Sequence, residues 1–251
     1  MRSVAKKKSE REGGLYETVK IIFQALLIAV VIRTFLFQPF NIPSGSMVET
    51  LLIGDYLFVS KYSYGYSQYS FPFALIPFSG RIIGSSPERG DIAVFKLPSD
   101  NATDYIKRVI GLPGDRIQVT DGVVEINGVA VARQQLEDYV EIGSNGREVR
   151  ARRYRETLPN GVSYDVLDTR ENGQFDSTGV YTVPEGHYFM MGDNRDNSID
   201  SRAQTLVGYV PYENFVGRAE IIFFSLRPGT PIWQIWNWPT AVRWDRIFST
   251  L

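Results

Sequence analysis

The sequence predicts a mainly β protein in which one N-terminal transmembrane helix precedes an antiparallel β domain with a β-rich insertion. Three observations carry this prediction: an apolar run near the N-terminus, short β-branched runs separated by turn residues, and no long helical stripe after Pro39. With 251 residues and 43% hydrophobic side chains, the chain can bury a sizeable core. We expect a basic tail at 1–14, the helix at 15–38 and the β domain at 39–251.

The helix prediction depends on residues 21–37, of which 14 of 17 are apolar. Seventeen helical residues cover roughly 25 Å, and a start at Leu15 extends the helix to the ~30 Å thickness of a hydrocarbon layer. Lys20 and Arg33 can then extend toward opposite headgroup layers. Pro39 is expected to end the helix.

A cleaved signal peptide and a buried helix of a soluble protein are the alternatives to a membrane anchor. A signal peptide is disfavoured because the apolar run continues through residues 35–37 without an early small-residue cleavage site. Residues 1–14 carry five basic and two acidic side chains, so the positive-inside rule predicts a cytoplasmic N-terminus. The chain after Pro39 is then expected outside the cytoplasm.

The β prediction is clearest at residues 116–131, where Asp121-Gly122 and Asn127-Gly128 separate alternating runs. These dipeptides favour two-residue hairpin turns, so the segment predicts a three-stranded meander. The higher content of charge and turn residues at about 121–185 indicates an inserted lobe. Further strands are expected at 56–62, 91–97, 104–110, 162–167, 188–191 and 216–224.

The composition excludes several kinds of chemistry. The chain has no cysteine and a single histidine, His187, which excludes disulfides, thiolate zinc sites and multi-histidine metal sites. Its 27 basic and 28 acidic residues nearly cancel, so the net charge does not indicate a nucleic-acid surface. We expect neither a metal nor a cofactor.

Three segments carry candidate chemistry. Residues 40–47 contain a Pro-Ser-Gly-Ser turn directly after the helix, which puts Ser46 close to the bilayer surface. In residues 104–115, Lys107 lies among apolar neighbours of a strand, where burial would lower its pKa toward that of a usable base. Residues 192–202 are dense in polar, turn-forming side chains. A nucleophilic Ser46 would need His187 or Lys107 as its base.

Together with the anchor, three motifs resemble bacterial type I signal peptidase, a family of membrane-anchored serine–lysine proteases. They are Ile-Pro-Ser-Gly-Ser-Met, Tyr-Ile-Lys-Arg-Val-Ile-Gly-Leu-Pro-Gly-Asp and Gly-Asp-Asn-Arg-Asp-Asn-Ser-Ile-Asp-Ser-Arg, and the resemblance covers about 15–226. It implies that Ser46 is the nucleophile and Lys107 the general base, and that the Ser46 N–H and the Ser44 hydroxyl form the oxyanion hole. The supporting residues that it implies are Ser198, which would orient the base, and the loop-holding residues Asp200 and Arg202.

The resemblance also implies the substrate and the place of action. The expected activity is removal of signal peptides, with small residues at −1 and −3, from exported precursors at the inner membrane through an acyl-enzyme. Expected partners are these precursors and membrane lipid, without nucleic acid. Residues implied to line the substrate pocket are Phe40, Ile42, Pro43, Met47, Leu51, Tyr105 and Ile106. The chain departs from the family pattern in having Glu49 where proline is usual, and one convincing span where many relatives have two.

Other functions and one segment stay open at this point. A self-cleaving serine–lysine repressor is disfavoured, because the chain has an anchor and no Ala-Gly or Cys-Gly pair. A catalytically inactive, membrane-anchored β module that binds envelope partners is the second alternative. The C-terminal region holds four tryptophans, Trp233, Trp236, Trp238 and Trp244, which suit either the membrane interface or a tail docked on the β core.

Overall fold

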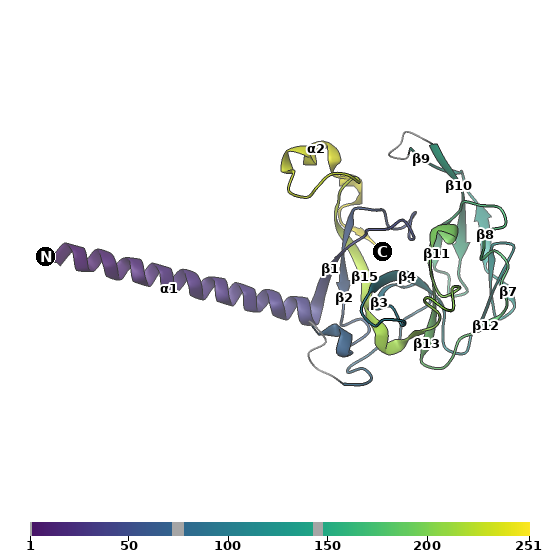
Figure 1. Cartoon of the computed structure of the whole chain (residues 1–251), viewed down its shortest axis with the longest axis horizontal. Helices are drawn as coiled ribbons and strands as arrows, with labels where there is room; N and C mark the ends of the chain where they lie inside the picture. The colour runs from purple at the N-terminus through teal and green to yellow at the C-terminus, as the bar shows by residue number, and fades with distance from the viewer. Residues whose placement is uncertain (1, 72–77, 143–147) are drawn as a thin grey trace.

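A long N-terminal helix projects from a β body in the computed structural model, which describes residues 2–71, 78–142 and 148–251 (Figure 1). Helix α1 (Arg2–Val31) continues as a π-helical turn (Ile32–Leu36). Within it, Gly14–Leu36 has a mean hydropathy of 2.1 and is almost wholly exposed, so this stretch is long and apolar enough to cross a membrane. A helix that is apolar all round and uncovered by protein suits a lipid environment.

The helix ends earlier than the sequence suggested. The chain passes directly from Leu36 into strand β1 (Phe37–Asn41), so Pro39 lies inside a strand and does not end the helix. Among the described strands, β1 lies at the edge of its sheet, next to β2. A proline that cannot donate a ladder hydrogen bond is tolerated at such an edge.

The expected mainly β architecture is confirmed, and its largest sheet is antiparallel throughout. The strand order is β1-β2-β15-β3-β4-β13-β14, and β16 adds to β15. The remaining strands of this sheet are β2 (Asp55–Ser60), β3 (Ile92–Lys96), β4 (Asp104–Gly111), β13 (His187–Met191), β14 (Val210–Pro211), β15 (Phe215–Ser225) and β16 (Ser249–Thr250).

Two smaller sheets lie on the side of the body away from α1 (Figure 1). One joins β12 (Tyr181–Thr182), β5 (Arg116–Thr120), β6 (Val123–Ile126) and β7 (Val129–Ala130). The other joins β11 (Ser163–Asp168), β10 (Glu148–Thr157), β8 (Ala132–Gln135) and β9 (Tyr139–Ile142). All but β5 fall within 121–185, and we propose this region as the inserted lobe.

The predicted meander is confirmed as β5, β6 and β7. Both turns have positive φ at their two central residues: 48° and 75° at Asp121 and Gly122, and 55° and 78° at Asn127 and Gly128. This is the geometry that makes Asp-Gly and Asn-Gly favourable in two-residue hairpins. Strands β1, β8, β9, β10, β12, β14 and β16 were not predicted, because they are very short, polar or interrupted by proline.

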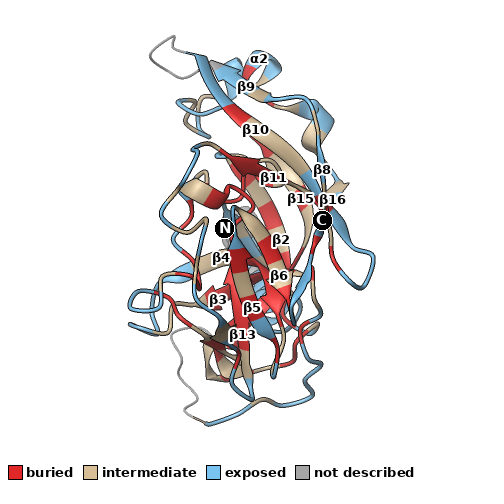
Figure 2. Cartoon of the chain, turned by 90° about the vertical axis from the view of Figure 1, so that its right-hand side faces the viewer, coloured by how far each residue is buried: buried red, intermediate tan, exposed pale blue. Residues whose placement is uncertain are grey.

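The strand β4 has the alternation that its sequence indicates. Tyr105 and Val109 pack in a core cluster with Phe95, while Ile106 packs against a different cluster that contains Met47. Figure 2 shows buried residues gathered along the central strands, and exposed ones toward β9 and α2 (Trp238–Ala241). Lys107 is therefore on a strand whose two faces are both covered.

The tryptophan-rich tail is divided between core and solvent. Trp238 packs on Phe224 of β15, with ring centroids 5.0 Å apart, and so docks the tail on the sheet. Trp233, Trp236 and Trp244 stay largely exposed. One tryptophan thus matches the docked interpretation, and three remain available to a membrane interface.

Candidate active site

Ser46 lies in a closed turn between β1 and β2. Ile42 donates its N–H to the Asp55 carbonyl at 2.8 Å, and Gly54 donates to the Ile42 carbonyl at 3.0 Å, which closes the base of the turn. The backbone N–H of Asn194 donates to the Ser46 carbonyl at 3.1 Å. The first and third sequence motifs are therefore joined through the backbone of Ser46.

Lys107 meets Ser46 in the interior of the protein. The Lys107 Nζ lies 2.7 Å from the Ser46 Oγ and 3.0 Å from the Ile106 carbonyl oxygen, and Lys107 is only 4% exposed. Its cross-strand neighbour on β3 is Ala93. Tyr105 also places its ring near this nitrogen, 5.4 Å from the ring centroid.

Burial changes the acid–base behaviour of Lys107. Removal from water disfavours the charged form and lowers the pKa of Lys107 to about 8. The nearby carboxylates of Asp200 and Asp193 oppose this shift, and the Arg202 guanidinium adds to it. A substantial fraction of this lysine is therefore neutral in mildly alkaline solution.

The other candidate base lies elsewhere. His187 begins β13, and its Nδ1 is 2.9 Å from the Glu185 carbonyl oxygen within the same turn. Of the two bases that the sequence left open, the structure brings Lys107 to Ser46.

The third motif packs around this pair through a buried ion pair. Arg202 donates to Asp200 from Nε and from Nη2, each at 2.8 Å, and both residues are buried. Burial opposes ionisation of Asp200, but the Arg202 guanidinium and the donors of Gly192 and Ser198 together hold the pKa of Asp200 below its usual value. Asp200 also accepts from the Gly192 N–H at 3.0 Å, and Arg202 donates to the Arg195 carbonyl at 2.6 Å.

Ser198 lies beside the pair without bonding to Lys107. Its hydroxyl is buried and, within the described part of the chain, makes no hydrogen bond of standard geometry, but it lies near enough to the Asp200 carboxylate to help lower the pKa of Asp200. A Cβ at Gly192 would come within 2.2 Å of the Ser198 Oγ and 2.5 Å of the Ser46 carbonyl oxygen. Glycine at position 192 is therefore what allows Ser198 and Ser46 to approach each other.

Two supporting ion pairs have no assigned role in the sequence analysis. Arg108, next to Lys107, binds the carboxylate of Asp193 through two hydrogen bonds of 2.9 and 2.7 Å. Arg195 binds Glu156 of β10, with one bond at 2.8 Å, and both side chains are buried. Arg108, Asp193 and Arg195 lie within the quoted motifs, but Glu156 has no sequence signal because its partner is 39 residues away.

A cavity of about 580 Å³ opens beside Ser46 and Lys107. Its walls include five other predicted site residues: Pro43, Ser44, Tyr105, Ile106 and Ser198. Four predicted pocket residues lie elsewhere. Ile42, Met47 and Leu51 are buried in a core cluster, and Phe40 packs against the same cluster, because the turn around Ser46 directs these side chains inward.

Comparison with known proteins identifies the family. A model of the family described as signal peptidase, peptidase S26, matches residues 15–224. The chain belongs to the signal peptidase family. The signal peptidase I of Rickettsia typhi is 44% identical over 90% of each chain, and that of Rickettsia conorii is 40% identical over 100% of this chain and 96% of its own. A solved signal peptidase I from Enterococcus faecalis is 33% identical, covers 53% of this chain and 97% of its own, and has a TM-score of 0.31.

In this signal peptidase family member, three ion pairs stabilise the surroundings of the Ser46–Lys107 pair. The Arg108–Asp193 pair ties β4 to the third motif, the Asp200–Arg202 pair closes the third motif on itself, and the Arg195–Glu156 pair ties it to β10. Buried pairs of this kind cost desolvation, but removing one partner leaves an uncompensated charge. Their contribution is therefore to fix the position of the third motif relative to β4 and β10.

Glu156→Gln tests this support. The substitution removes the carboxylate that neutralises buried Arg195, so we expect a loss of about 3–5 kcal/mol in unfolding free energy. The matched control is Asp165→Asn, which breaks the more exposed pair between Asp165 of β11 and Arg155 of β10. Chemical denaturation in detergent checks both variants. Equal midpoint shifts in the two variants would show that the buried pair has no special structural role.

Proposed function

We propose that this chain is an endopeptidase that removes signal peptides from exported precursor proteins at the membrane surface. The observation that carries the proposal is the 2.7 Å contact between Ser46 Oγ and the Nζ of buried Lys107, in a chain whose family is that of signal peptidase I. This contact joins a nucleophile to a base of lowered pKa beside a cavity. The inactive binding module has no comparable support.

The proposed reaction begins with neutral Lys107. Its Nζ accepts the Ser46 proton while the Ser46 Oγ attacks the carbonyl carbon of the scissile bond. The resulting ammonium group of Lys107 then donates a proton to the leaving amine, and the signal peptide stays attached as an ester of Ser46. Water, deprotonated by Lys107, releases the signal peptide and restores the hydroxyl group.

The tetrahedral intermediate needs donors for its oxyanion. We assign this role to the Ser46 N–H and to the hydroxyl of Ser44, which is exposed on the cavity wall beside Ser46. Donors aimed at the developing charge are typically worth about 3–4 kcal/mol each. Because Ser44 is exposed, its hydroxyl is free to turn toward a bound substrate.

Ser198, Asp200 and Arg202 act as positioning residues in this proposal. The buried Ser198 hydroxyl has spare hydrogen-bonding capacity next to Ser46, which suits a group that stabilises the lysine ammonium during turnover. Asp200 and Arg202 hold the loop that carries it.

The cavity wall suits small substrate side chains at −1 and −3. Pro43, Tyr105 and Ile106 give the cavity wall its apolar surface. Asp104, Lys107 and the serines of the turn, Ser44 and Ser46, form a polar part of the wall. Four apolar residues contribute indirectly, because they pack in the core beneath the turn that carries Ser46: Phe40, Ile42, Met47 and Leu51. We assign no role to a metal or to nucleic acid.

Ser46→Ala is expected to abolish cleavage of a purified precursor with an Ala-x-Ala site, because among the described residues Ser46 is the hydroxyl that hydrogen-bonds to the Lys107 Nζ. The control is Ser163→Ala, which changes an exposed serine of β11 that is far from Ser46 in the sequence. Both proteins are compared with the wild type in the same detergent micelles, by gel mobility and mass of the products. Equal cleavage by Ser46→Ala would refute the assignment, and binding without cleavage by the wild type would favour the inactive module.

The pH dependence follows from the state of Lys107. The protonated form cannot accept a proton, and the lowered pKa is about 8. The cleavage rate should therefore rise about tenfold per pH unit well below 8 and level off above it. Initial rates between pH 6 and 10 measure this, and circular dichroism over the same range controls for unfolding. A flat profile would contradict Lys107 as the titrating base.

We also propose the orientation of the chain in the inner membrane. The basic residues at 1–14 favour a cytoplasmic N-terminus, which puts Ser46 on the extracytoplasmic side. Added protease should then digest the β domain in intact spheroplasts, without lysis. Digestion only after lysis would show the opposite orientation.

A further inference from the structure

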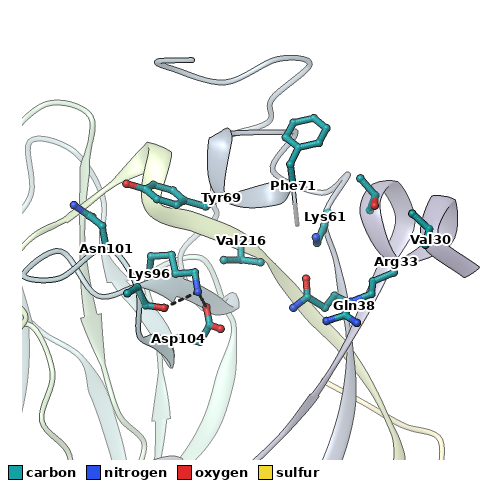
Figure 3. A pocket seen from close by; sticks show the side chains of 12 residues that line it. Val30, Arg33, Gln38, Lys61, Tyr69, Phe71, Lys96, Asn101, Asp104 and Val216 are labelled. Atoms are coloured by element: carbon teal, nitrogen blue, oxygen red, sulfur yellow. Dashed lines mark hydrogen bonds and ion pairs between the residues drawn. The ribbon is translucent and has the colours of Figure 1, made fainter. Parts of the chain in front are cut away.

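A second cavity, of about 620 Å³, lies where α1 meets the β body, apart from Ser46 and Lys107. Figure 3 shows Arg33, Val30 and Gln38 on one side of it, Lys96 and Asp104 on the other, and Val216 between them. Its remaining described walls are Thr34, Lys61, Tyr69, Phe71, Asn101 and Ala102.

Positive charge is in excess around this cavity. Three cationic residues line it, Arg33, Lys61 and Lys96, against one carboxylate, Asp104. Asp104 is already paired with Lys96 at 2.9 Å. Within the described residues, no carboxylate lies within ion-pair distance of Arg33 or Lys61, so this cavity has unneutralised charge.

Lys61 is the unusual member of the set. It is 2% exposed, and its Nζ donates to the Ser70 carbonyl at 2.6 Å; among the described residues this is its one acceptor, for three donors. Burial and the charge of Arg33 lower the pKa of Lys61 to about 8. An anion in the cavity would offset both effects, because it would supply the missing acceptor and the opposite charge.

The cavity lies at the end of the apolar helix segment. Val30 and Arg33 belong to the last two turns of Gly14–Leu36, so in a bilayer they lie near the headgroup layer. Val30, Tyr69, Phe71 and Val216 give the walls an apolar part beside the cationic one. Such a combination matches a molecule with a phosphate and hydrocarbon chains.

The junction holds the cavity in shape. Lys61 donates its N–H to the Leu36 carbonyl at 2.9 Å, and the Tyr66 hydroxyl donates to the Phe35 carbonyl at 2.7 Å. The Phe35 ring meets those of Tyr66 and Phe71 edge-on, with centroids 5.8 and 6.1 Å apart. The last turn of the helix is thus fastened to the body, and the site is preformed.

We propose that this cavity binds the phosphate of an anionic phospholipid from the leaflet at the C-terminal end of α1. Lys61 and Arg33 donate to the phosphate oxygens, and the lipid chains lie along the apolar wall and α1. A substrate segment is the competing occupant, since Asp104 also borders the cavity at Ser46. The excess of positive charge favours the phosphate. The proposal depends on α1 spanning the membrane and is independent of Ser46 as a nucleophile.

The test is lipid retention by the full-length protein. The protein is equilibrated in detergent with equal amounts of phosphatidylglycerol and phosphatidylcholine, and bound lipid is counted by native mass spectrometry. We expect the wild type to retain phosphatidylglycerol selectively, and Arg33→Gln to bind it about tenfold more weakly, as for the loss of one charge-assisted hydrogen bond. Arg33→Lys keeps the charge and should retain most of the binding. Lys61→Gln removes the buried donor and should also weaken the binding of phosphatidylglycerol.

Two controls set the baseline. Arg150→Gln removes the same charge from an exposed position on β10 and should change nothing. Ser46→Ala should also bind lipid as the wild type does, so this result stands even if cleavage by Ser46 is refuted. Circular dichroism confirms that Arg33→Gln is folded.

Four outcomes would overturn the proposal. Equal retention of both lipids, or equal losses in Arg33→Gln and Arg150→Gln, would show nonspecific binding to the apolar helix. Displacement of the lipid by millimolar inorganic phosphate would assign the cavity to a free anion. Displacement by a neutral signal-peptide segment, with the same affinity in Arg33→Gln, would assign it to substrate.

Discussion

The burial of an amine against a hydroxyl is the constraint on which the rest of this structure depends. Lys107 is almost fully enclosed, so its charged form is disfavoured, and its Nζ lies 2.7 Å from Ser46 Oγ. The core clusters on both sides of β4 exclude water from this contact. Arg108, which follows Lys107 on β4, then binds the third motif through its ion pair with Asp193.

The same network explains why segments far apart in sequence form one site. The turn at Ser46, the middle of β4 and the loop at 192–202 contribute no long-range hydrophobic pattern of their own. They are joined through backbone bonds to Ser46 and through buried carboxylate–guanidinium pairs, which specify relative position as well as contact. Such buried pairs add little net stability, but when both partners are present they fix the relative positions of the segments that they join.

Much of this arrangement was predictable from the sequence, and the rest depends on tertiary contacts. The meander at 116–131, the apolar helix and the strand at Lys107 follow from turn dipeptides and periodicity, which act locally. The strand β10 is rich in arginine and forms because partners pair along both of its edges. Likewise, the inward direction of Met47 and Leu51 depends on how the turn folds, and Glu156 finds Arg195 only in the folded chain.

The absence of a linker between α1 and β1 has a mechanical consequence. Leu36 ends the helix, Phe37 begins the sheet, and the hydrogen bonds of Lys61 and Tyr66 fasten the two together. From Phe37 to Ser46 the chain spans at most about 30 Å, so a helix α1 that crosses a bilayer would hold Ser46 close to the membrane surface. Under the proposed function, a precursor anchored in the same bilayer would present to Ser46 a peptide bond at a limited distance from the membrane. That distance would then help to select the cleavage site, together with the residues that flank it.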